Sequence, residues 1–298
     1  MIESNSVNSQ SYADDTQLNK SCAPEDLPHA VETVQNCIVD VKGWMTDNKL
    51  KLNDSKTEVV LVKSKWCVNL DDSITSMRIG SADIAFAESA RDLGFMVSGD
   101  ELSLHTHVSN TCRLAYNEIR RIGGIRQYLT VDVTKTLVSA FVLSRLDFCN
   151  SLLSGCNKKY LHKLQLVQNS AARLIFRSRR RDHVTPLLHA LHWLPVQARI
   201  EYKLCTLCFN FFSGTCPVYF SQLLTKYSIG REGNRSDNDS RVLTSIKRNI
   251  NYVTLGERSF SFCAPEVWNS LPFEIRHKES LSSFKSALKT YLFRTYFS

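Results

Sequence analysis

The sequence has no long apolar run and no secretory signal. None of its 298 residues belongs to a stretch of about 18 uncharged apolar residues, the length that a membrane-spanning helix needs. Residues 1–15 are polar and acidic, whereas a signal peptide begins with basic residues and continues with apolar ones. We therefore expect an intracellular protein, cytoplasmic or nuclear and not secreted, with no membrane partner.

Cysteine is also scarce for a chain of this length. Ten cysteines at scattered spacings are too few for a fold stabilised mainly by disulfide bonds, so we expect reduced, buried thiols. Cys205 and Cys208 have the spacing of half a zinc site, with Cys216 beyond them. No second pair follows, and an apolar helical pattern surrounds the first, so core thiols are favoured over a metal site.

The common hydrolase signatures are missing as well. The sequence contains no nucleophile elbow, no HExxH and no glycine-rich phosphate loop. The histidines His183, His189 and His192 lie close together, but only Asp182 accompanies them. We expect surface or capping histidines there, and we do not expect a hydrolase.

What is present is a strong segregation of charge. Residues 1–100 contain 9 Lys+Arg and 16 Asp+Glu, a net of −7, so the remainder contributes +15 to the total of +8. An acidic front suits metal binding, and a basic rear suits a polyanion such as nucleic acid. A solvated basic surface without a partner is an equally good interpretation of the charge alone.

Apolar periodicity predicts an α+β fold. Residues 27–45 have the spacing of an amphipathic helix, and short strands are expected at 57–62, 78–80, 84–86 and 93–97. From residue 103 the pattern becomes helical. The first expected helix runs from Val108 and is ended by Gly123-Gly124, and further helices are expected over residues 131–141, 158–177, 196–212 and 281–297. Residues 260–271 are rich in aromatic side chains.

Four regions follow from this pattern. Residues 1–100 form a small α+β region, residues 101–227 a helical region, residues 228–241 a flexible linker and residues 242–298 an aromatic, helical C-terminal module. On the helix expected at 158–177, basic residues share one face, opposite the apolar one. The predicted nucleic-acid contacts are Lys159, Lys163, Arg173, Arg177, Arg179, Arg180 and Arg181.

The motif that carries chemistry is Tyr12-Ala13-Asp14-Asp15. Two adjacent carboxylates repel each other unless a cation offsets their charge. Nucleotide polymerisation uses two Mg²⁺ ions, and Mg²⁺ selects oxygen ligands, which a tight hairpin turn can present. By itself the tetrapeptide is a weak signal, because any acidic turn could contain it by chance, and a surface turn is then the default interpretation.

The stretch SYADDTQL, residues 11–18, is similar to the YxDD motif of LINE-type (non-LTR retrotransposon) reverse transcriptases. Later segments resemble, in the expected order, the palm, the entry to the thumb and downstream blocks of these polymerases. Together they extend the resemblance over residues 11–298. The segments are WMTDNKLKLNDSKTEVVLV, RDLGFMVSGDELSLHTHV, SRLDFCNSLLSG, LQLVQNSAARLIF, DHVTPLLHALHWLPVQARIEYKL and SFCAPEVWNSLP.

The resemblance implies an RNA-directed DNA polymerase domain whose partners are an RNA template and a DNA primer. It implies that Asp14 is a catalytic metal ligand and Asp15 its neighbour in the acidic cluster. Tyr12 would lie near the primer end or the incoming nucleotide, and Lys56 near the active site. It also implies a palm-like antiparallel sheet, so we expect Asp14 and Asp15 beside a sheet formed by residues 56–58 and 93–95.

The resemblance further implies an incomplete enzyme. In the family another metal-binding aspartate comes from an upstream strand, but residues 1–10 contain no aspartate and residues 5–10 have little β-propensity. The expected fragment starts just before its YADD motif and lacks the fingers and the endonuclease domain. We expect no polymerisation by this chain alone, and Mg²⁺ binding only if the missing carboxylate is supplied.

Two alternatives stay open. The basic helices could form a non-catalytic nucleic-acid-binding module, whose affinity would fall steeply with salt. The helices could also form a protein-interaction scaffold anchored by aromatic residues, although such residues are more often core than interface. The candidate anchors are Trp193, Trp268, Phe260 and Phe262.

Overall fold

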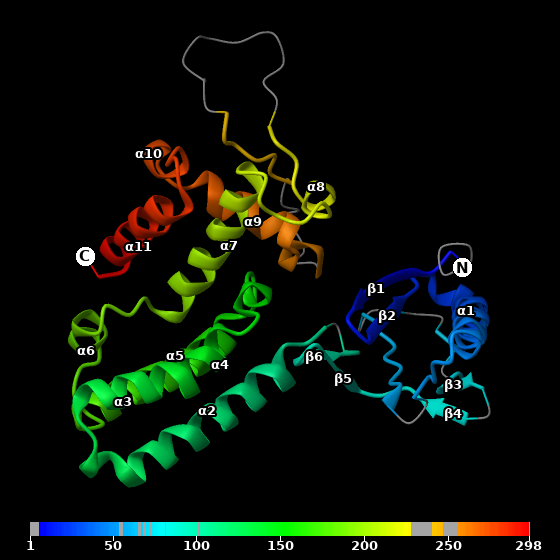
Figure 1. Cartoon of the computed structure of the whole chain (residues 1–298), viewed down its shortest axis with the longest axis horizontal. Coiled ribbons are helices and arrows are strands. Elements are labelled where there is room, and N and C mark those ends of the chain that lie inside the picture. The colour runs from blue at the N-terminus through cyan, green and yellow to red at the C-terminus, as the bar shows by residue number, and fades with distance from the viewer. Residues whose placement is uncertain are drawn as a thin grey trace. The chain divides into compact units, whose positions relative to one another are not determined.

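The structure, a computed structural model, describes residues 6–53, 56–64, 67, 70–71, 73–80, 82–100, 102–227, 240–246 and 255–297 (Figure 1). Two compact units divide the chain, Met1–Thr106 and His107–Ser298. Helices occur with small antiparallel sheets, which confirms the α+β class. Of the expected linker, residues 228–239 lie outside the described residues.

The first unit contains one long helix and short strands. Its described strands pair in chain order as three two-stranded antiparallel sheets, and not as the single palm-like sheet that was expected. The elements are β1 (Asn8–Tyr12), β2 (Asp15–Asn19), α1 (Leu27–Asp47), β3 (Ser76–Ile79), β4 (Ala82–Ala85), β5 (Ser89–Asp92) and β6 (Phe95–Ser98).

Helix α1 forms where the amphipathic pattern predicts it. Pro28 stands in its first turn, where a missing N–H costs nothing, and Leu27, Ala30 and Cys37 are buried. The helix packs against β3, in which Met77 is buried. These contacts form the small core of the first unit.

The segment expected as a strand at 57–62 forms only isolated bridges. Val59 bridges Phe86 in parallel, and the Ala87 amide donates to the Val59 carbonyl at 2.7 Å. The strand expected at 93–97 begins two residues later, because Leu93 and Gly94 have positive φ angles of 45° and 88° and make the turn between β5 and β6. Residues 89–92, not expected as a strand, form the other half of this hairpin.

The second unit is helical within its described residues. The helix α2 (His105–Ile125), which begins at the boundary of the two units, leads into it. The others are α3 (Val131–Val138), a π-helix (Ser139–Leu143), α4 (Ser144–Asp147), α5 (Lys158–Phe176), α6 (Thr185–Ala190), α7 (Val196–Phe212), α8 (Phe220–Leu223), α9 (Phe260–Asn269), α10 (Phe273–Arg276) and α11 (Leu281–Phe297).

The pair Gly123-Gly124 does not end α2, contrary to the prediction. The helix continues through both glycines to Ile125. Glycine has a low helix propensity, but tertiary contacts can override it. The adjoining 3₁₀ turn η4 (Arg126–Tyr128) is fixed by Arg126, whose guanidinium donates to the Leu174 and Ile175 carbonyls at 3.0 and 2.6 Å. The helix end is therefore set by a contact with α5 and not by the glycines.

The C-terminal segment shares its core with the helical region. Helix α7 packs against both α9 and α11. The Phe209 ring stacks on Phe284 at 4.4 Å between centroids, and Phe212 stacks on Trp268 at 5.3 Å. Because Phe209, Phe284 and Trp268 are at most 1% exposed, the expected C-terminal module is part of one core with α7.

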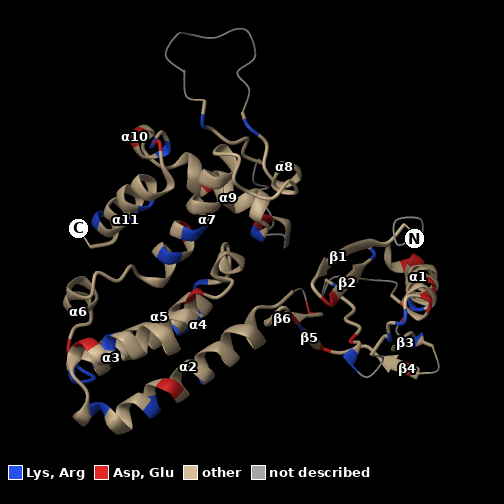
Figure 2. Cartoon of the chain, viewed as in Figure 1, with Lys and Arg blue, Asp and Glu red and all other residues tan. Residues whose placement is uncertain are grey.

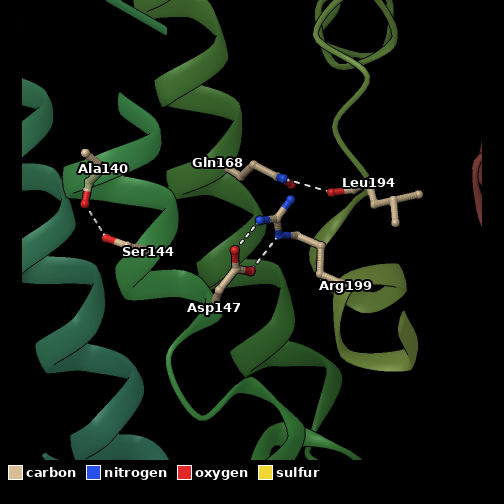
Figure 3. Close-up of polar contacts among 6 residues, drawn as sticks. All are labelled: Ala140, Ser144, Asp147, Gln168, Leu194 and Arg199. Atoms are coloured by element: carbon tan, nitrogen blue, oxygen red, sulfur yellow. Dashed lines mark hydrogen bonds and ion pairs between the residues drawn. The ribbon is translucent and has the colours of Figure 1, made fainter. Parts of the chain in front are cut away.

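Polar contacts between helices fix their register at the junction of α4, α5 and α7 (Figure 3). Arg199 donates to both oxygens of Asp147, with its Nε at 2.7 Å from Oδ1. A half-buried bidentate pair of this kind contributes about 1 to 2 kcal/mol. The fully buried Gln168 donates its amide to the Leu194 carbonyl at 2.9 Å, which holds α5 against the turn that leads into α7.

No helix in the described part of the chain is long and apolar enough to cross a membrane.

Candidate functional site

The YADD motif forms the tip of the β1–β2 hairpin. Tyr12 pairs with Asp15 across the hairpin, so Ala13 and Asp14 are its two loop residues. Ala13 has a φ of 54°, the left-handed conformation that a tight two-residue hairpin requires at its first position. Residues 8–12 thus do form a strand, despite their low β-propensity, because the turn aligns them with β2.

Both strands of this hairpin are almost wholly exposed. Only Leu18 is half-buried among the ten strand residues. The hairpin is closed by polar contacts: the Ser11 and Thr16 hydroxyls lie 3.2 Å apart, and Lys20 Nζ donates to the Ser6 carbonyl at 2.8 Å. A two-stranded sheet with two polar faces is marginally stable alone, so these polar contacts are needed to hold the hairpin.

The motif presents an exposed set of oxygens. Asp14 and Asp15 are exposed, and Tyr12 is 70% exposed. Because directly paired residues of an antiparallel ladder share a face, the Tyr12 ring and the Asp15 carboxylate project to the same side of the hairpin. The tip can therefore offer carboxylate oxygens and an aromatic ring together.

In the described part of the chain, the other residues expected in a polymerase site form no hydrogen bond or ion pair with this turn. Lys56 is exposed in a short turn, and no hydrogen bond or ion pair there connects it to Asp14 or Asp15. Within the described residues, 56–58 and 93–95 do not form the expected sheet, and β1–β2 is a sheet of its own, so the expectation that such a sheet lies beside Asp14 and Asp15 is wrong. Among the described residues no three His, Cys, Asp or Glu side chains form a metal-binding group. Asp14 and Asp15 suit Mg²⁺ in donor type, but they supply only part of a binding site.

The predicted basic face is divided between the two ends of α5. With a rise of about 1.5 Å per residue, Lys159 and Arg177 lie about 27 Å apart. Lys159 and Lys163 are exposed near the N-terminal end. The arginines belong to the C-terminal end, where the macrodipole favours cations. The structure therefore gives two basic clusters and not one continuous stripe.

Two of these arginines bind backbone carbonyls. Arg173 donates to the Asp182 carbonyl at 3.0 Å, and Arg177 donates to the Arg126 carbonyl at 2.9 Å. These two hydrogen bonds hold residues 126 and 182 against the C-terminal end of α5. Arg179, Arg180 and Arg181 follow in an exposed turn, and none of them forms an ion pair with a described carboxylate.

Sequence reasoning missed the residues that η4 brings to this end of α5. Arg126 is buried and donates to three carbonyls, of Leu174, Ile175 and Leu129. Tyr128, two residues later, is 79% exposed. The clue in the sequence was the run RRIGGIRQY at 120–128, in which arginines flank a tyrosine; the assumption that Gly123-Gly124 ended the helix concealed it.

The cysteine pair lies in the core, as expected. Cys205 and Cys208 are fully buried on α7, and burial raises the pKa of both thiols well above the usual range. Cys208 donates weakly to the Ala264 carbonyl. His183, His189 and His192 are exposed, and the last two contact Phe293 on α11. Of the aromatic candidates, Trp193, Trp268 and Phe262 are buried, and Phe260 is half-buried.

Comparison with known proteins identifies no relative: no protein-family model, no curated protein and no solved structure matches this chain.

Proposed function

We propose that this chain carries the metal-binding turn and the downstream helical region of a non-LTR retrotransposon reverse transcriptase, an RNA-directed DNA polymerase. The observation that carries the proposal is the YADD sequence at the tip of a two-residue hairpin with both carboxylates exposed. The order of the segments that resemble these polymerases supports it. An RNA template and a DNA primer are the proposed partners.

In this proposal Asp14 and Asp15 hold Mg²⁺, which as a Lewis acid stabilises charge on the oxygens of a triphosphate. Tyr12 shares a face with Asp15 and would contact the primer end or the nucleotide. Positioning two ions requires more carboxylate ligands than this turn provides. Polymerisation therefore depends on a further carboxylate, and the described residues bring none to the hairpin.

The metal site can be tested directly with Mn²⁺, a paramagnetic substitute for Mg²⁺. In amide NMR spectra of the full chain, Mn²⁺ should broaden the signals of residues 13–16 first. The double variant Asp14→Asn/Asp15→Asn should abolish this selective broadening. Asp83→Asn, at an exposed aspartate of β4, is the matched control and should leave it intact. Equal broadening in the double variant would refute the proposed metal site.

Primer extension tests whether the site is complete. On an RNA template with Mg²⁺, the chain alone should extend a DNA primer no further than its Asp14→Asn variant does, because two carboxylates position the ions poorly. Extension clearly above that variant would show that the turn suffices, and it would overturn the requirement for another carboxylate.

A further inference from the structure

The C-terminal ends of α2 and α5, with the turns that follow them, carry a set of residues that we call the arginine corner. It consists of Arg120, Arg121, Arg126, Arg173, Arg177, Arg179, Arg180 and Arg181, with Tyr128 among them. Only Glu118 and Asp182 are acidic neighbours in these two segments. Figure 2 shows Lys and Arg gathered where α2 and α5 end.

The corner is rigidly assembled from segments almost fifty residues apart. Arg126 donates to the Leu174 and Ile175 carbonyls, and Arg177 donates back to the Arg126 carbonyl. The turn at 179–182 is closed by the Arg179 amide, which donates to the Asp182 carboxylate at 2.6 Å. These contacts use Arg126, Arg173 and Arg177 as structural groups, and they fix the backbone that carries Arg180 and Arg181.

The exposed members of the corner offer two kinds of contact. Arg180 and Arg181 are exposed cations in the closed turn, whereas the 79% exposed side chain of Arg121 pairs with Glu118 at 3.6 Å. Tyr128 presents a ring that is 79% exposed, and Ile125, three residues earlier, is also exposed. Arg126 and Arg177 tie η4 to the last turn of α5, from which the cationic turn at 179–182 continues.

We propose that the arginine corner binds single-stranded nucleic acid, with Tyr128 as the stacking platform for an unpaired base and Arg180 and Arg181 as phosphate contacts. Neutralisation of phosphates accounts for the cations, but not for an exposed ring among them. A base can stack on such a ring only when it is unpaired, which favours a single strand over a duplex. The inference is independent of the metal site proposed above.

Fluorescence anisotropy with a labelled, unstructured oligouridylate of about 12 nucleotides tests the proposal on the full chain. Tyr128→Ala should weaken binding about fivefold or more, the value of one stacked base, while leaving the salt dependence unchanged. Tyr128→Phe keeps the ring and should bind within about twofold of the parent. Tyr219→Ala, which removes a 55% exposed tyrosine elsewhere, is the control.

The phosphate contacts have their own readout. Arg180→Ala/Arg181→Ala should lower the slope of log affinity against log salt by about 1.4, since each phosphate contact to a single strand contributes about 0.7. Lys285→Ala/Lys289→Ala removes the same charge from α11 and should not change the slope. A larger effect of the lysine pair would place the contact elsewhere and refute the proposal.

The identity of the partner is decided by competition. A duplex of the same length and a polyglutamate peptide should compete poorly. If either competes as well as the oligouridylate, or if Tyr128→Ala binds normally, the corner does not recognise unpaired bases. Asp14→Asn/Asp15→Asn should bind the oligonucleotide like the parent, so failure of the corner and failure of the metal site are separable results.

Discussion

At the scale of the residue, two cysteines with the same spacing can be metal ligands or core side chains, and the residues around them determine which. Cys205 and Cys208 have metal-like spacing, but they lie on the buried face of α7 and one of them contacts the carbonyl of Ala264 on α9. Their thiols must stay neutral in the fold. Burial beside Cys208 and Glu201 raises the pKa of Cys205, and burial raises that of Cys208.

This burial predicts a loss of stability in alkali. In the unfolded chain both thiols ionise above about pH 8.5, whereas in the folded chain they do not, so their contribution is full below that pH and is lost as pH rises. The free energy of unfolding should fall by up to about 2.7 kcal/mol per pH unit for the pair. Urea denaturation between about pH 7.5 and 10 measures it.

The control for the alkaline loss is Cys205→Ala/Cys208→Ala. This variant should be less stable at neutral pH because of the cavities it creates, but it should show a shallower decline above about pH 9. An unchanged slope would assign the alkaline loss to other groups, of which Tyr296 is one, since burial and its hydrogen bond to Glu201 also raise its pKa.

At the scale of the element, the hairpin that carries Asp14 and Asp15 contains a strained loop residue. Ala13 adopts a left-handed φ of 54°, which costs an L-residue with a β-carbon about 1 kcal/mol relative to glycine. Backbone strain of this kind is tolerated where position matters more than stability. Alanine at this position therefore makes the hairpin less stable than glycine would.

Ala13→Gly should stabilise the hairpin by about 0.5 to 1 kcal/mol, because glycine adopts this φ without a steric penalty. Amide hydrogen exchange in β1 and β2 should slow about two- to fivefold. The matched control is Ala85→Gly in β4, which has no positive φ and should accelerate exchange in its own hairpin. Slower exchange in both variants, or in neither, would exclude strain at Ala13.

The elements also show how far the sequence predicts this fold. Helices α7 and α11 begin and end as expected, because their apolar stripes are long and Pro195 marks a start. The short strands were less predictable: β5 was missed, and residues 57–62 form only bridges, since four-residue strands carry little periodic signal.

The candidate sites were predictable to different degrees. The hairpin turn at Asp14 and Asp15 could be inferred from four residues, because turn and chemistry are local. The arginine corner could not, since it depends on Arg126 reaching the carbonyls of Leu174 and Ile175 across 48 and 49 positions of sequence. Helical projection placed Arg173 and Arg177 on a basic face, but it could not show that both bind carbonyls.

At the scale of the whole molecule, charge separates with the two units. Residues 1–106 contain 9 Lys+Arg and 17 Asp+Glu, a net of −8, and residues 107–298 contain 28 against 12, a net of +16. The proposed metal-binding turn belongs to the acidic unit and the arginine corner to the basic one. Each unit therefore suits the ligand proposed for it: cations for the first, a polyanion for the second.

The shared core of the second unit predicts where the chain can be cut. A fragment of residues 103–298 keeps Ser103, whose hydroxyl accepts the His105 amide, and should unfold cooperatively. A fragment of residues 103–227 loses the partners of Phe209 and Phe212, so it should aggregate or unfold without a sharp transition. Calorimetry of both fragments tests this, and equal, sharp transitions would contradict a common core.

Burial of the thiols leaves the molecule with a convenient label position. Of the ten cysteines, Cys22 alone is exposed, and it lies three residues after the last residue of β2. A maleimide-linked nitroxide should therefore attach there first, close to the hairpin and without any substitution. Electron spin resonance of that probe would report Mn²⁺ arriving at the YADD turn of the native sequence.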